Sequence, residues 1–218
     1  MGLKVNDGGN YITIYQGKFS MRVPDNTPGA VQRVNKLGKT VFEKYYDSFT
    51  GKLVSIKTQD GDYGKSWLFS FKDGKEVYHL QLSYSNSFAT AFLKMLPNID
   101  VTKEMKVSPQ QKMDSDGKNR SSLFINQDGI TIKHAYTKDQ PNGMPDMEQV
   151  MIKGQLVWDD TKRLQFLEAM VNEKIVPKLE GLGKTETEMP EVSTNENEKS
   201  NFDQIDGPDE VGDDEPPF

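Results

Sequence analysis

The sequence predicts a mainly β protein, in which a small antiparallel β barrel with one internal helix precedes a C-terminal amphipathic helix and a disordered acidic tail. Three observations predict this fold. Four runs rich in β-branched and aromatic residues follow one another between residues 40 and 84, with turn sequences between them. One helical pattern then interrupts the strands, and further strand patterns follow it. The chain from residue 186 onward is dominated by acidic residues.

The first part of the chain predicts one or two strands over residues 11–23, broken near Gln16 and Gly17. A link rich in Pro, Asn and Gly follows over residues 24–29. Residues 32–39 are polar and basic. They predict either a solvated loop or an arm that contacts phosphates, and its basic residues are Arg33, Lys36 and Lys39.

The densest β signal predicts a four-stranded antiparallel meander, because short β-rich runs alternate with Gly and Asp turns. Its expected strands cover residues 40–49, 52–59, 65–71 and 76–84. Alternation along the last strand predicts which side chains face the core. The inward set is Tyr78, Leu80, Leu82 and Tyr84.

A helix is expected next, capped by Asn86 or Ser87 and followed by Pro97. Its apolar stripe consists of Phe88, Ala91, Phe92, Met95 and Leu96. Further strands are predicted at residues 104–108, 120–126 and 129–136, the last two as a hairpin. Strands, one helix and strands again is the order of a five-stranded OB barrel, here with extra strands.

A short strand at residues 154–158 precedes Asp159 and Asp160, which favour a helix cap over a metal site. The following stripe predicts an amphipathic helix that Pro177 interrupts or ends, and it consists of Leu164, Leu167, Met170, Val171 and Ile175. We expect this helix to pack on the barrel, and a dimer contact is the alternative. The length of 218 residues fits one sizeable domain plus a tail, over residues 1–182 and 183–218.

Charge is divided unevenly between the body and the tail. Residues 186–218 contain 12 acidic residues and one lysine, a net charge of −11. Since the whole chain carries −6, residues 1–185 carry +5. Like-sign charge and few apolar residues predict that the tail stays disordered. The division suggests a body that meets an anionic ligand and a tail that meets a cationic one, or the body itself.

The last six residues combine acids, two stiff prolines and an aromatic ring: Asp213, Asp214, Glu215, Pro216, Pro217 and Phe218. A solubilising tail has no use for that ring, whereas a partner with an apolar pocket rimmed by Lys or Arg would use all six. This tip resembles that of bacterial and bacteriophage single-stranded DNA-binding proteins. The resemblance implies an OB-fold body that coats single strands and a tip that recruits replication, recombination or repair enzymes. Pro216 departs from that family's tip, where an apolar residue usually precedes Pro-Phe.

A single strand needs a positive surface and flat aromatic faces on which bases stack. The candidates lie in the β-rich half of the body: Lys36, Lys39, Lys44, Tyr46, Lys52, Lys57, Trp67 and Lys72. Each has a plainer interpretation. The row of Trp67, Phe69 and Phe71 favours a core, and lysines usually belong to a solvated surface.

Other classes of function find little support in the sequence. Two Gly-Lys-Thr triplets, ending at Thr40 and Thr185, lack the glycine that a phosphate loop needs. No cysteine is present, and two distant histidines predict no metal centre and no cofactor. No apolar run reaches the roughly 18 residues of a membrane span, and the N-terminus lacks the pattern of a signal peptide, so we expect a cytoplasmic protein.

The leading hypothesis is therefore a non-enzymatic, sequence-independent single-stranded DNA-binding protein of bacteriophage type. The first alternative is an acidic-tailed assembly protein or DNA mimic that binds no nucleic acid. A metal-dependent nuclease built on scattered carboxylates is the second. The sequence predicts no particular oligomeric state.

Overall fold

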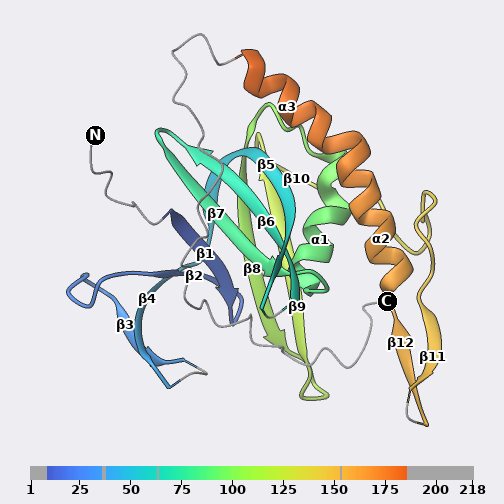
Figure 1. Cartoon of the computed structure of the whole chain (residues 1–218), viewed down its shortest axis with the longest axis horizontal. Helices are drawn as coiled ribbons and strands as arrows, with labels where there is room; N and C mark the ends of the chain where they lie inside the picture. The colour runs from blue at the N-terminus through green and yellow to red at the C-terminus, as the bar shows by residue number, and fades with distance from the viewer. Residues whose placement is uncertain (1–8, 36–37, 63, 153, 186–218) are drawn as a thin grey trace.

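The computed structural model describes residues 9–35, 38–62, 64–152 and 154–185. Within these ranges the chain is mainly β. Ten strands form one large mixed sheet, and two more form a separate hairpin (Figure 1). The N-terminal strands of the sheet are β1 (Asn10–Tyr15), β2 (Lys18–Arg22), β3 (Val31–Val34) and β4 (Thr40–Tyr46). Its other strands are β5 (Phe49–Gly61), β6 (Gly64–Asp73), β7 (Glu76–Ser83), β8 (Glu104–Met113), β9 (Asn119–Gln127) and β10 (Ile130–Thr131).

The strand order in the sheet is β10-β9-β8-β5-β6-β7-β1-β2-β4-β3. Neighbours pair antiparallel except β1 and β7, which run parallel. The predicted four-stranded meander is thus wrong in one strand, because β4 pairs with β2 and β3 rather than with β5. Among the described residues, the ends of the sheet are not joined by hydrogen bonds into a closed barrel.

The sheet nevertheless curls, and the turn between β1 and β2 comes into contact with β8. The β1–β2 turn consists of Gln16 and Gly17, whose positive φ angles of 49° and 73° form a tight hairpin. This turn lies directly on β8, since a Cβ atom on Gly17 would come within 2.3 Å of the Gln111 backbone nitrogen. Glycine is therefore required there by both backbone conformation and close packing.

One continuous core fills the curled sheet. Trp67, Phe69 and Phe71 of β6 are fully buried, as alternation predicts for one face of that strand. Leu80 and Leu82 of β7 are also buried, whereas the predicted inward residues Tyr78 and Tyr84 are only half-buried. The same core includes side chains from β5, β8 and β9.

The internal helix α1 (Ser87–Met95) forms where the sequence predicts it. Asn86 caps it, because its side-chain oxygen accepts hydrogen bonds from the backbone N–H groups of Phe88 and Ala89. A 3₁₀ turn, η1 (Leu96–Asn98), ends the helix at Pro97. Phe92 packs against Phe69 and Phe71, so α1 closes one side of the core.

The C-terminal helix runs longer than predicted (Figure 1). It consists of α2 (Thr161–Met170), a π-helical turn η2 (Val171–Ile175) and α3 (Val176–Thr185). Pro177 lies in the first turn of α3 and does not end the helix. The π turn directly before it shifts the hydrogen-bond register, which accommodates a residue without an N–H group. Asp160 is the N-cap residue of α2 but makes no side-chain cap bond, whereas Asp159 before it accepts from the Thr161 N–H at 3.0 Å.

Two segments differ from the sequence prediction. Residues 31–34 form the edge strand β3 instead of a loop, because Val31 to Val34 pair with β4. The strand expected over residues 129–136 shrinks to the two residues of β10. The chain then leaves the sheet so that Tyr136 can enter the core and pack edge-on against Phe166 of α2.

The second sheet is a hairpin of β11 (Glu148–Ile152) and β12 (Gln155–Asp159), which projects beside α2 (Figure 1). In the described part of the chain, no helix is long and apolar enough to cross a membrane. The core extends to Leu179, with Leu182 packed against it. The predicted tail from residue 186 lies outside the described residues.

Candidate nucleic-acid interface

Three of the predicted lysines share the outward face of the β5–β6–β7 meander. Their register shows it: Lys52 lies opposite Lys72, and Lys57 lies opposite Leu68. These positions alternate with the inward residues of β5 and β6. The structure therefore brings together Lys52, Lys57 and Lys72 from two adjacent strands.

Two rings extend this outward face onto β7 and β1. The rings of Tyr11 and His79 lie 5.0 Å apart, where β1 pairs parallel with β7. His79 Nδ1 shares a hydrogen bond of 2.9 Å with the Ser70 hydroxyl. Burial and the nearby charge of Lys57 both lower the pKa of His79. A neutral imidazole beside a lysine can take up a proton when an anion arrives.

Short side chains lie between the long ones on this face. The outward residues of β6 are Ser66, Leu68 and Ser70, all nearly buried. They lie in register between Lys57 on one side and the β7 residues His79 and Gln81 on the other. Hydrogen bonds run along this row as well, since Gln81 Nε2 donates to the Ser66 hydroxyl at 3.3 Å. The outward side of β6 is therefore largely covered by the side chains of its neighbouring strands, and Lys57 and Lys72 remain exposed.

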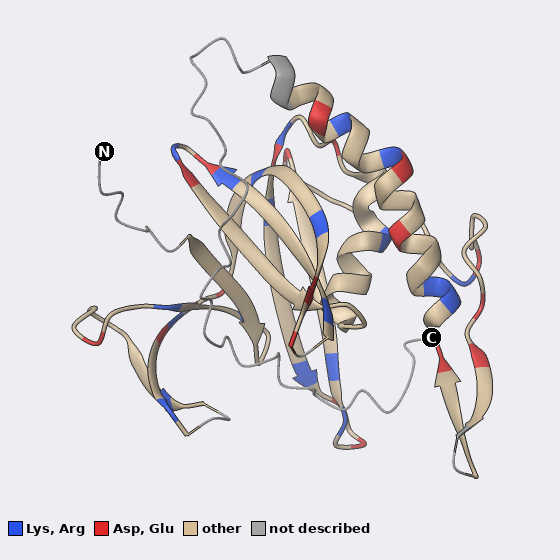
Figure 2. Ribbon diagram, viewed as in Figure 1, with Lys and Arg blue, Asp and Glu red and all other residues tan. Residues whose placement is uncertain are grey.

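Acidic residues limit the positive charge of the interface. Glu104 of β8 lies directly opposite Lys52. Figure 2 shows basic positions on several strands of the main sheet, with acidic positions among them. The outward face is thus moderately basic, which suits a ligand bound by many weak phosphate contacts.

Lys44 and Tyr46 lie away from the three outward lysines. They pair with Met21 and Phe19 of β2, so they belong to the inward side of β4. Tyr46 is 37% exposed, and Lys44 Nζ lies 5.8 Å from its ring centre. An exposed tyrosine beside a lysine still offers a stacking surface, but on a different part of the molecule. Lys39 is exposed just before β4.

Trp67 is a core residue, which corrects its place among the stacking candidates. Its side chain is 1% exposed. Its ring stacks on Tyr84 at 5.6 Å, and its indole N–H donates to the Tyr84 carbonyl at 3.3 Å. A base cannot reach this ring without opening the core. The aromatic row of Trp67, Phe69 and Phe71 on β6 is therefore part of the hydrophobic core.

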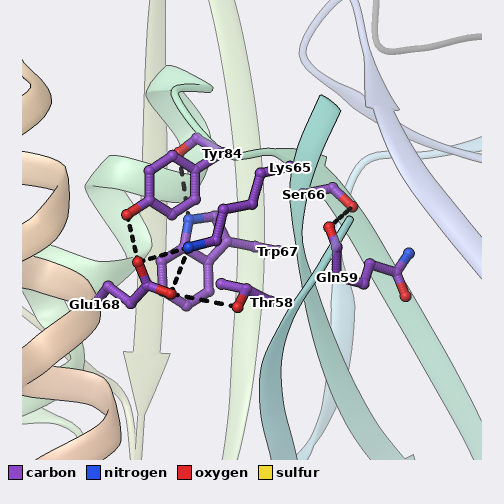
Figure 3. Close-up of polar contacts among 7 residues, drawn as sticks. All are labelled: Thr58, Gln59, Lys65, Ser66, Trp67, Tyr84 and Glu168. Carbon is purple, nitrogen blue, oxygen red and sulfur yellow. Dashed lines mark hydrogen bonds and ion pairs between the residues drawn. The ribbon is translucent and has the colours of Figure 1, made fainter. Parts of the chain in front are cut away.

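Around Trp67, a polar cluster fixes α2 to the sheet (Figure 3). Lys65 Nζ contacts both carboxylate oxygens of Glu168, at 2.6 and 2.7 Å, and the Tyr84 hydroxyl donates to Glu168 at 2.6 Å. Thr58 Oγ1 donates at 3.3 Å. Burial alone would raise the pKa of Glu168, but the bonds from Lys65 and Tyr84 outweigh it and lower that pKa. Lys65 therefore helps to hold α2 against the sheet through its ion pair with Glu168.

Arg33 likewise forms an ion pair within the fold, with Glu43. Its guanidinium donates to both oxygens of Glu43, at 3.1 and 2.7 Å, and lies over the Tyr15 ring at 5.4 Å. Tyr45 donates to the same carboxylate at 2.9 Å. Burial and the bond to Glu43 raise the pKa of Tyr45 to about 12. The bidentate pair ties β3 to β4, which argues against a phosphate-contacting role for Arg33.

Sequence reasoning missed a second set of outward residues on β8 and β9. Phe124 lies between the buried residues Leu123 and Ile125 and is 41% exposed. Lys112 and Arg120 lie opposite each other on the same outward side. The signal was present in the sequence, because Phe124 puts a large ring at the polar position of an alternating strand.

Several predicted positions lie outside the described residues. They are Lys36 and the whole tip from Asp213 to Phe218. Among the described residues, no group of three or more His, Asp or Glu side chains is arranged to hold a metal ion. Comparisons with protein-family models, with curated proteins and with solved structures found no match to this chain.

Proposed function

We propose that this protein binds single-stranded DNA without reading its sequence, coating strands exposed during bacteriophage DNA replication, recombination or repair. The observation that carries the proposal is the shared outward face of Lys52, Lys57 and Lys72, bordered by the rings of Tyr11 and His79. Cations for phosphates and flat rings for bases are the two requirements of sequence-tolerant strand binding.

The strand order supports an OB-like body. In an OB barrel, three strands form a meander, a helix follows, the fourth strand returns to pair with the first, and the fifth pairs with the fourth. Strands β5, β6, β7, α1, β8 and β9 follow this order. The barrel would be open between β7 and β9. OB barrels bind oligonucleotides on the face of the second and third strands, which here are β6 and β7.

The acidic tip is proposed to recruit partner proteins. Asp213 to Phe218 would dock through the Phe218 ring and the preceding acids into an apolar pocket rimmed by basic residues. The partners would be replication or recombination proteins, such as a polymerase, helicase, primase or nuclease. This part of the proposal rests on the resemblance of the tip alone.

Titration of the whole chain with fluorescently labelled oligo-dT tests the binding function. Binding should be strong at low salt and weaken steeply as salt rises, with much weaker binding to a duplex. Replacing Lys57 and Lys72 by Gln should reduce the slope of log K against log salt by about 0.7 for each phosphate that the variant no longer neutralises. Lys162→Gln is the matched control, because Lys162 lies on α2, where it pairs with Glu148 of β11, and not on the outward face of the sheet.

Absence of salt-dependent binding would overturn the proposal and favour the acidic-tailed assembly protein. Equal slopes for the double variant and Lys162→Gln would reject the outward face of β5 and β6 as the binding surface. Degradation of the oligonucleotide only when Mg²⁺ is added would instead favour the nuclease.

A further inference from the structure

A shallow hollow lies on the outward side of the β8–β9 hairpin, whose strand β8 pairs with β5, the strand that carries Lys52 and Lys57. Its volume is about 320 Å³. The strand register brings its walls together, with Gln110 opposite Ser122 and Lys112 opposite Arg120. It is lined by Gln110, Lys112, Met113, Asp114, Arg120, Ser122 and Phe124. The hollow thus combines one aromatic ring, two cations, neutral hydrogen-bonding groups and the Asp114 carboxylate, which pairs with Arg120.

Phe124 presents an apolar ring to solvent in this hollow. A ligand that covers this ring would remove apolar surface from water, which favours binding. The surrounding amide and hydroxyl groups of Gln110 and Ser122 can donate and accept hydrogen bonds. A planar, polar-edged group such as a nucleobase fits both features.

The two cations lie opposite each other, four residues along the hairpin from Phe124, and can hold the phosphates of a nucleotide whose base reaches that ring. Arg120 pairs with Asp114 at 2.6 Å, but its side chain is 72% exposed. An exposed ion pair is worth at most about 1 kcal/mol, so a phosphate can replace Asp114 at little cost. Asp114 keeps another partner when displaced, because it accepts a hydrogen bond from the Ser115 N–H.

We propose that this hollow holds one nucleotide of the bound strand, with its base stacked on Phe124 and the flanking phosphates held by Lys112 and Arg120. The inference rests on the proposed single-strand binding and extends its surface to a second site. Strands β5 and β8 join the two sites, since Thr50 lies opposite Lys106 and Lys52 lies opposite Glu104. Across the strands, β5 and β9 lie two interstrand spacings apart, about 10 Å, and along β8 Lys112 lies eight residues from Glu104, the partner of Lys52, which is about 27 Å. The resulting span of roughly 30 Å is within reach of the roughly 4–16 nucleotides that an OB fold covers.

The first test compares Phe124→Ala with Ile130→Ala in the full chain, by fluorescence anisotropy with labelled oligo-dT. Ile130 is the matched control because it is 69% exposed on β10 and does not line the hollow. Loss of one base stack should weaken binding by about 5- to 150-fold in Phe124→Ala and leave Ile130→Ala unchanged. On an oligonucleotide whose sugars carry no bases, the two variants should bind equally.

A second variant gives a direct reading of stacking and does not depend on affinity. Phe124→Trp, in a Trp158→Phe background, leaves the buried Trp67 as the other tryptophan. Oligo-dT should quench the emission of the new tryptophan, and the abasic chain should not. Millimolar dTMP should not displace the oligonucleotide, because one nucleotide lacks the contacts on β5 and β6.

The outcomes separate this inference from the proposed function. If the wild-type chain binds oligo-dT, but Phe124→Ala binds equally well and Phe124→Trp is not quenched, the hollow is no base site and strand binding stands. Displacement of the strand by dTMP would reassign the hollow to free nucleotides. If the wild-type chain binds no oligo-dT, both proposals fail together.

Discussion

His79 links the proposed binding surface to pH at the scale of a single residue. Burial and Lys57 lower its pKa below the ordinary 6.5, so the imidazole is neutral at neutral pH. The pKa of His79 is lower in the folded protein than in the unfolded chain. Its neutral form therefore supports the fold above pH 6.5, and this stability is lost as pH falls through the lowered pKa. A phosphate beside His79 reverses the effect of Lys57 and raises the pKa.

Strand binding should therefore take up a proton at His79. We expect the affinity for oligo-dT to rise as pH falls from about 7.5 to 5.5, by at most about tenfold if the bound strand raises the pKa of His79 by about one. Anisotropy titrations across this range measure it. His79→Gln should flatten the dependence, whereas His134→Gln should keep it. An unchanged slope in His79→Gln would place the phosphates elsewhere.

The sequence predicts individual residues unevenly, and strand register explains why. Lys52, Lys57 and Lys72 were predicted and share one outward face. Lys44 and Tyr46 were predicted with them but lie on the inward side of β4, because pairing with β2 sets their orientation. No local sequence pattern shows that β4 pairs with β2. Phe124 was visible as a break in alternation, but only the register of β8 shows that it adjoins cations.

At the scale of elements, the C-terminal helix depends on Glu168. Its carboxylate gathers bonds from Lys65, Tyr84 and Thr58, which belong to three segments of the sheet region (Figure 3). Because these contacts lower the pKa of Glu168, they stabilise the fold above its ordinary pKa of 4.5. The stabilisation is lost as pH falls through the lowered value.

Glu168→Gln should reduce the free energy of unfolding by about 1–3 kcal/mol at pH 7, since the variant lacks the charged hydrogen bonds of a half-buried site. Urea unfolding followed by circular dichroism measures the difference. As pH falls through the lowered pKa of Glu168, the gap between wild type and variant should narrow, because the wild-type carboxylate becomes protonated. Glu148→Gln, at an exposed ion pair with Lys162, should cost less than about 1 kcal/mol. Equal losses in both variants would contradict an anchoring role for Glu168.

Elements with strong local signals were predicted well, and those set by tertiary contacts were not. Asn86 and the apolar stripe after it are sufficient to predict α1. The continuation of the C-terminal helix past Pro177 depends on the π turn before it, which no sequence rule anticipated. Likewise, the edge strand β3 exists because β4 offers it a partner, including the Arg33–Glu43 pair.

At the scale of the whole molecule, the division of charge predicts a competition. The tail carries −11 and residues 1–185 carry +5. As the disordered chain that the sequence predicts, the tail would reach roughly 30 Å. It can therefore compete with DNA for the basic surface, as well as present Phe218 to a partner.

Two full-length designs separate the two roles of the tail. Exchanging its 12 acidic residues for Gln and Asn should tighten oligo-dT binding at low salt, by roughly tenfold, and salt should erase the gain because the competition is electrostatic. Scrambling residues 186–218 keeps the charge of −11 but destroys the order Asp213 to Phe218. DNA binding should then stay at the wild-type level, while capture of a purified replication protein from the same host is abolished. Equal DNA affinity for the neutral tail and the wild type at low salt would reject the competition. A scrambled tail that still captures the partner would mean that charge alone recruits it.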